Sequence, residues 1–211
     1  MVCPPAYFLR SLREQYKGKG LLFGGQTISR YESGSHTGEI SLPMLLDSKC
    51  SHVILGHSEQ RNTGETNEGV NKKIKLSLKS KIAPVACIGE SERDEDAQYL
   101  FYIKNQIIEI FKDLTPAEAK KVVIAYEPIW AIGAKEPMKG YEMHQMVLFI
   151  RKVLMKLYSA NTAKGVAIIY GGSINESNMA DMNENGFVDG LIIGRASLDP
   201  EQVAALAKAL K

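Results

Sequence analysis

One stretch decides the fold of this chain: Val122-Val123-Ile124-Ala125-Tyr126-Glu127-Pro128-Ile129-Trp130-Ala131-Ile132-Gly133. The apolar run that opens it is typical of a buried strand in a parallel sheet that is covered on both faces. Glu127 follows at the carboxyl end of that strand, where α/β proteins commonly place catalytic groups. Pro128 favours an extended conformation for the residue before it. The stretch therefore predicts a carboxylate at an abrupt strand exit, with an ion pair at the rim of the sheet as the alternative reading.

The same alternation of apolar runs and amphipathic stretches continues along the whole chain. Strands are predicted at residues 2–3, 21–25, 52–56, 84–89, 122–126, 166–170 and 189–194. Helices are predicted at 6–16, 42–48, 67–79, 99–111, from 116, at 144–158 and from 200. This order favours an α/β fold of seven parallel β/α units in a single domain over residues 1–211. A flavodoxin-like open sheet is the less favoured alternative.

Composition excludes several classes of protein. The 211 residues carry a net charge of +2 and no basic cluster interleaved with aromatics, so we expect no nucleic-acid partner. Three widely spaced cysteines (Cys3, Cys50 and Cys87) do not form a disulfide framework. No apolar run approaches the roughly 18 residues of a membrane span, and no signal-peptide pattern opens the chain. We expect a cytoplasmic protein without a membrane partner.

A histidine follows the third predicted strand, in Gly56-His57-Ser58-Glu59. At the start of a helix, the positive end of the helix dipole disfavours a charged imidazolium. A neutral imidazole there can donate a hydrogen bond to a substrate carbonyl. A structural or merely exposed histidine is the alternative.

Two glycine-containing turns follow the last two predicted strands, Tyr170-Gly171-Gly172-Ser173-Ile174-Asn175 and Gly194-Arg195-Ala196-Ser197. Backbone N–H groups gathered in such turns bind anions, although either turn alone is also ordinary turn chemistry. Two of them after the last two strands match the phosphate site of a β/α barrel. Together with Gly133 they predict a phosphorylated small molecule as ligand.

A carboxylate base, a neutral electrophile and a phosphate cradle suit proton abstraction next to a carbonyl, with return of the proton to the neighbouring carbon. The sequence has no metal-ligand spacing, Walker loop, or activated serine or cysteine arrangement. We therefore expect neither a cofactor nor a metal.

These residues closely resemble the triosephosphate isomerase family over essentially the whole chain. The matching stretches are Gly25-Gln26-Thr27-Ile28-Ser29, Thr37-Gly38-Glu39-Ile40-Ser41, Ile54-Leu55-Gly56-His57-Ser58-Glu59, Cys87-Ile88-Gly89-Glu90, Ala125-Tyr126-Glu127-Pro128-Ile129-Trp130 and Tyr170-Gly171-Gly172-Ser173. The resemblance implies a TIM (β/α)8-type barrel, of which seven units are recognisable. It also implies interconversion of glyceraldehyde 3-phosphate and dihydroxyacetone phosphate through an enediolate, a step of glycolysis and gluconeogenesis.

The resemblance also assigns roles to individual residues. Glu127 would be the base, His57 the electrophile that polarises the carbonyl, and Glu59 a supporting carboxylate. The substrate phosphate would be bound mainly through backbone N–H groups at four positions: Gly133, Ser173, Gly194 and Arg195. The loop after Trp130 would close over the substrate. The family's homodimer would form through loop 26–39.

Some features depart from the family pattern. The chain starts at what looks like the family's second strand, so the first βα unit with its Asn and catalytic Lys has no counterpart, and activity is expected to be impaired. Gln60 replaces an arginine expected to pair with Glu39 across the dimer, Arg195 replaces a glycine, and loop 131–137 is short. These loop changes leave open an erythrulose-phosphate isomerase of the same family. The missing lysine leaves open a non-catalytic phosphosugar-binding remnant.

Overall fold

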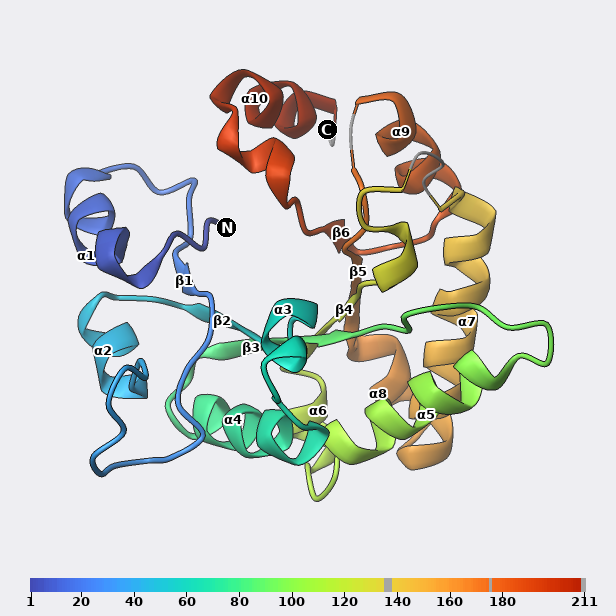
Figure 1. Ribbon diagram of the computed structural model, residues 1–211, viewed down its shortest axis with the longest axis horizontal. Coiled ribbons are helices and arrows are strands. Elements are labelled where there is room, and N and C mark those ends of the chain that lie inside the picture. Colours follow the sequence, from blue (N-terminus) through green and yellow to red (C-terminus); the bar gives the residue numbers. More distant parts are fainter. Residues whose placement is uncertain (135–137, 175, 210–211) are drawn as a thin grey trace. The chain divides into compact units, whose positions relative to one another are not determined.

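The computed structural model describes residues 1–134, 138–174 and 176–209, and its parallel strands alternate with helices (Figure 1). The chain divides into two compact units. One comprises Met1–Cys87 and Glu109–Val123, and the other comprises Ile88–Ile108 and Ile124–Lys211. Within the described residues, no helix is both long and apolar enough to cross a bilayer.

The first unit is built on strands that pair in parallel and in chain order, β1 (Gly24–Gly25), β2 (His52–Leu55) and β3 (Ala83–Ile88). Gly24 lies opposite His52, and Ile54 lies opposite Val85. The helices of this unit are α1 (Ala6–Gln15), α2 (Leu42–Asp47), α3 (Ser58–Asn62), α4 (Asn67–Lys79) and α6 (Pro116–Ala119).

The core of the first unit forms where α4 packs on β2. Val53 and Leu55 alternate along β2 and are fully buried, as are Val70 and Ile74, one turn apart on α4. The helix begins at Thr66, whose hydroxyl accepts a hydrogen bond from the N–H of Gly69. The face of β2 formed by alternate residues and the face of α4 formed by residues four apart are therefore both buried where the two elements pack together.

The second unit contains β4 (Val123–Tyr126), β5 (Ala167–Tyr170) and β6 (Gly190–Leu191) as neighbours in that order. Ile169 lies opposite Gly190 in the parallel β5–β6 pair. Most of α5 (Gln98–Ile110) belongs to this unit. The other helices are η1 (Ile129–Ala131), α7 (Gly140–Leu157), α8 (Ala160–Gly165), α9 (Glu176–Asn185), η2 (Arg195–Leu198) and α10 (Pro200–Ala209).

The predicted α/β class with parallel strands is confirmed, but the count of seven β/α units is wrong for the described residues, which form six strands instead of the eight of a closed barrel. The predicted strand at residues 2–3 is only an isolated bridge between Val2 and Phe23. Pro4 and Pro5 follow it directly and have no N–H to continue a ladder, so the strand cannot extend.

Several element boundaries also differ from the prediction. Helix α7 begins at Gly140 instead of 144, because the Glu142 carboxylate accepts a 2.9 Å hydrogen bond from the N–H of Lys139 and caps the first turn. The predicted helix ranges do not include the short helices α3 and α8, although a helix start is expected at His57, the N-cap of α3. Their few residues carry too little apolar periodicity to be recognised. The capping box at Thr115 and the helix range 67–79 are confirmed.

Candidate active site

Glu127 directly follows the end of β4 and is a buried residue, 8% exposed. Its backbone N–H donates a 2.7 Å hydrogen bond to the carbonyl of Ile88. On the other side, the N–H of Gly171 donates to the carbonyl of Tyr126 at 2.8 Å. A Cβ atom on Gly89 would lie 1.8 Å from the Glu127 carbonyl oxygen, so only glycine allows this close approach of backbones. The backbone that carries the carboxylate is therefore held from both sides.

A second buried carboxylate, Glu90, holds the residues on either side of Glu127. The Tyr126 hydroxyl donates to both oxygens of Glu90, at 2.7 and 3.0 Å. Trp130 Nε1 donates to Glu90 Oε1 at 2.9 Å, and Ile129 N donates to the Glu90 carbonyl at 2.9 Å. The Glu90 side chain is only 2% exposed, so these donors replace its water. Glu90 thereby joins the end of β4 to the turn that follows it.

Arg93 balances the charge of Glu90. Its Nε lies 3.2 Å from Glu90 Oε1, and its guanidinium carbon lies 5.0 Å from the centre of the Trp130 ring. Burial raises the pKa of Tyr126 well above its ordinary value, and the neighbouring charge of Glu90 raises that pKa further. Tyr126 therefore remains a protonated donor at any physiological pH.

Three of the four predicted phosphate ligands come together in the second unit. The N–H of Gly133 donates to Ser173 Oγ at 2.7 Å, and Ser173 Oγ donates to the carbonyl of Ala131 at 3.0 Å. Gly133 has a positive φ of 73°, and a Cβ there would lie 2.7 Å from Arg195 Nη2. Gly194, next to Arg195 in the chain, is exposed at the start of η2. A guanidinium and a hydroxyl thus flank the glycine of the loop.

His57 belongs to the first unit and occupies the N-cap of α3. Its Nδ1 accepts a 3.3 Å hydrogen bond from the N–H of Glu59, which leaves the proton of a neutral ring on Nε2. The imidazole is 30% exposed, whereas the Glu59 side chain is 86% exposed, with Oε2 3.9 Å from His57 Nδ1. The predicted helix-terminal histidine is therefore present, and in the neutral ring the protonated Nε2 is a hydrogen-bond donor.

Loop 26–39 contains no helix or strand, as predicted. Within it, Ser29 Oγ donates a hydrogen bond to the carboxylate of Glu39, and the rings of Tyr31 and His36 stack with centroids 3.9 Å apart. In the loop predicted to close, residues 131–134 are described and 135–137 lie outside the described residues.

The sequence prediction missed Glu90 and Arg93 as parts of the site. Glu90 enters the sequence prediction only within a stretch that matches the family, although it follows a buried strand in the same way as Glu127. Its position directly after a buried strand is the feature of the sequence that could have identified Glu90 as part of the site. No cluster of three or more His, Cys, Asp or Glu side chains placed to hold a metal ion occurs in the described part of the chain.

Comparison with known proteins gives a consistent result. A family model described as triosephosphate isomerase matches residues 1–210. The triosephosphate isomerase of Endomicrobium trichonymphae is 39% identical over 210 residues, which cover 99% of this chain and 84% of that protein. The enzyme of the same name from Alkaliphilus oremlandii is 40% identical over 205 residues, covering 96% of this chain and 82% of that protein. The Moorella thermoacetica protein of that name is 36% identical over 208 residues, with coverages of 98% and 83%.

Proposed function

This chain belongs to the triosephosphate isomerase family of isomerases, and we propose that it interconverts dihydroxyacetone phosphate and glyceraldehyde 3-phosphate. The family's reaction is a step of glycolysis and gluconeogenesis. We propose that the chain acts in the cytoplasm, as a single barrel-type domain, and as a homodimer through loop 26–39.

In the proposed reaction, the carboxylate of Glu127 removes a proton from the carbon next to the substrate carbonyl. His57 donates a hydrogen bond from Nε2 to the carbonyl oxygen and stabilises the negative charge of the enediolate. Glu127 then returns the proton to the neighbouring carbon, which completes the exchange of ketose and aldose. Glu59, which gives its N–H to His57 Nδ1, keeps the donor on Nε2.

The substrate phosphate is proposed to bind at Gly133, Ser173, Gly194 and Arg195. Ser173 already bonds the N–H of Gly133, and the guanidinium of Arg195 reaches the same glycine. A guanidinium pairs strongly with phosphate oxygens through two parallel N–H donors. Arg195 therefore supplies positive charge at a site whose other ligands are backbone groups.

The observation that best supports this function is the mounting of Glu127. The residue is 8% exposed, its N–H bonds the carbonyl of Ile88, and the N–H of Gly171 bonds the carbonyl of Tyr126 on the other side. A catalytic base needs such fixed placement, because small displacements of a reacting group cost large factors in rate. A carboxylate of a surface ion pair needs no such support.

The test is a coupled isomerase assay on the purified chain, with glyceraldehyde 3-phosphate and an erythrulose phosphate side by side. The Glu127→Gln variant, which keeps the shape and removes the base, is the blank. Turnover of the triose above that blank supports the proposal. Preference for the four-carbon substrate transfers the assignment to an erythrulose-phosphate isomerase.

A non-catalytic phosphosugar-binding protein is the second candidate, favoured by the grouping of Gly133, Ser173 and Arg195 independently of Glu127. It predicts affinity for a substrate-like phosphate ester that survives Glu127→Gln, without turnover of either sugar. In both cases Arg195→Gln should weaken phosphate-ester binding several-fold, seen as a higher KM or Kd with kcat little changed.

A further inference from the structure

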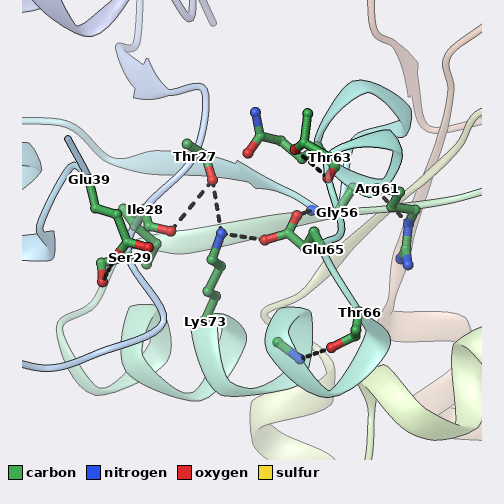
Figure 2. A network of polar contacts seen from close by, with 12 residues as sticks. Thr27, Ile28, Ser29, Glu39, Gly56, Arg61, Thr63, Glu65, Thr66 and Lys73 are labelled. Atoms are coloured by element: carbon green, nitrogen blue, oxygen red, sulfur yellow. Dashed lines mark hydrogen bonds and ion pairs between the residues drawn. The ribbon is translucent and has the colours of Figure 1, made fainter. Parts of the chain in front are cut away.

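A polar network joins Gly56 to α4 and to the segment after β1 (Figure 2). Glu65 Oε2 accepts a 2.9 Å hydrogen bond from the N–H of Gly56, the residue directly before His57. The other oxygen of Glu65 pairs with Nζ of Lys73, which reaches up from α4. Lys73 also donates to Thr27 Oγ1 at 3.1 Å, two residues beyond β1.

The charges of this network are shielded from water. The Glu65 and Lys73 side chains are 7% and 11% exposed. Removing two charges from water is unfavourable, and the attraction between the two ions often does no more than offset that cost. Replacing such a pair by apolar side chains is often neutral or stabilising, so stability alone is a weak reason for having it.

Side-chain hydrogen bonds of this network instead converge on the backbone N–H and carbonyl of Gly56. Its N–H is held by Glu65, and its carbonyl accepts a 2.8 Å hydrogen bond from Arg61 Nε. Arg61 also donates to the carbonyl of Cys87 at 3.1 Å and to Asn67 Oδ1 at 2.7 Å. Both polar groups of the residue before His57 are thus held by side chains.

Gly56 itself leaves no room for adjustment. Its φ is +70°, a conformation that favours glycine, and a Cβ there would lie 2.9 Å from both Arg61 Nη2 and Val70 Cγ2. The chain turns here from β2 into α3, and His57 is the first residue after the turn. A change in the Gly56 peptide would therefore rotate the backbone that aims the imidazole.

We propose that Glu65 is a positioning residue for His57: its buried carboxylate, paired with Lys73, holds the N–H of Gly56 and so sets the direction of the imidazole. This role rests on the proposed function of His57 as the electrophile. On this proposal, the main role of the Glu65–Lys73 pair is to orient the imidazole of His57, and its contribution to folding stability is secondary.

Two double variants separate the effect of the hydrogen-bond acceptor at position 65 from the effect of the Glu65 and Lys73 charges. Glu65→Gln with Lys73→Met removes both charges and keeps an amide oxygen for the N–H of Gly56. Glu65→Leu with Lys73→Met removes both charges and the acceptor. Glu68→Gln is the matched control, because Glu68 forms an exposed 2.7 Å pair with Lys72 on the same helix.

We measure kcat and KM for the triose phosphates, together with the ring 15N signals of His57, which report the tautomer. The Glu65→Gln, Lys73→Met variant (the Gln pair) should match the unmodified chain in its kinetic constants and in its His57 signals. The Leu pair should lose about tenfold or more in kcat with KM changed less than about twofold. Its His57 signals should move from a single Nε2–H tautomer towards a mixture.

Equal kcat values and equal His57 signals for the two double variants would overturn the proposal. If the unmodified chain shows no isomerisation above the Glu127→Gln blank, the proposed function fails, while the His57 signals still decide the positioning role. If the Leu pair does not fold, hydrogen exchange of the Gly56 amide in the unmodified chain decides instead. Slow exchange, made faster by Glu65→Asp, supports the proposal, and fast exchange in the unmodified chain contradicts it.

Discussion

Trp130 Nε1 lies 2.9 Å from Glu90 Oε1 and ties the turn after the proposed catalytic base to a buried carboxylate just beyond β3. The same carboxylate accepts from Tyr126, the residue before Glu127. One side chain thus orders the backbone on both sides of the base, which explains how the strand exit at Glu127 can be rigid.

The first prediction concerns this bond. Trp130→Phe keeps an aromatic ring over Arg93 and removes the N–H, and it should lower the free energy of unfolding by about 1.5–3 kcal/mol, as expected for a hydrogen bond to a charged group. Glu90→Leu should cost more, about 3–5 kcal/mol, because it leaves Arg93 without its buried partner. Urea denaturation measures both free energies.

Tyr102→Phe, at an exposed position of α5, is the control and should change the free energy of unfolding by less than about 0.5 kcal/mol. Equal costs for Trp130→Phe and the control would refute the role of the bond.

The close approach of Gly89 to Glu127 gives a second prediction. In Gly89→Ala, the new Cβ would overlap the Glu127 carbonyl oxygen, which lies 1.8 Å from its ideal position. Backbone cannot rotate away as a flexible side chain can, so we expect a loss of about 3 kcal/mol or more in unfolding free energy.

The matched change is Gly69→Ala in the first turn of α4, where the nearest atom to the Cβ position is Thr66 Oγ1 at 3.5 Å. It should stabilise the chain by about 0.5–1 kcal/mol through a lower backbone entropy of unfolding. Denaturation midpoints of the two variants should therefore move in opposite directions. A Gly89→Ala variant as stable as the unmodified chain would show that the two backbones are not in contact.

A third prediction uses the only tryptophan of the sequence as a reporter. Ser173→Ala removes the acceptor for the Gly133 N–H and the donor to the Ala131 carbonyl. The turn that contains Trp130 then loses its hydrogen bonds to the loop that follows β5. Acrylamide quenching of Trp130 fluorescence should increase.

Ser159→Ala is the control for that experiment, because Ser159 caps α8 through a 3.2 Å bond to the Thr162 N–H in the same unit. It should cost about 1 kcal/mol of stability and leave tryptophan quenching unchanged. Identical quenching of the two variants would contradict the link between Ser173 and the loop.

Stability at alkaline pH provides a fourth prediction. Burial raises the pKa of the Cys3 thiol from its ordinary value of 9.0 to about 11. Between these values the unfolded chain loses the proton while the folded chain keeps it, so the unfolding free energy falls as pH rises from about 9 to about 11. Below about pH 9 the thiol is protonated in both states and contributes no slope.

Cys3→Ser removes this titration, because a serine hydroxyl does not ionise in the range. Urea midpoints measured between pH 8 and pH 11 should therefore fall more steeply for the unmodified chain than for Cys3→Ser. Parallel slopes would show that the thiol is as accessible to water in the folded state as in the unfolded chain.

How well the sequence predicted each part depended on the range of the interactions. The ranges of α1, α4 and α5 followed from apolar periodicity, and the capping box at Thr115 followed from four adjacent residues. The predicted strand at residues 2–3 failed, because a strand exists only where a partner continues the ladder. The extra residues of α7 depended on a cap that the apolar pattern did not show.

By itself, the sequence determined the α/β class, the strand exit at Glu127, the helix start at His57 and the family, because these depend on local patterns and on motifs of adjacent residues. Only the tertiary structure decided which distant side chains support them. Glu90 holds the neighbours of Glu127 from 36 positions away in the sequence, and Lys73 reaches Thr27 from 46 positions away. Periodicity carries no information about such pairs, since burial and direction arise only when separate elements pack together.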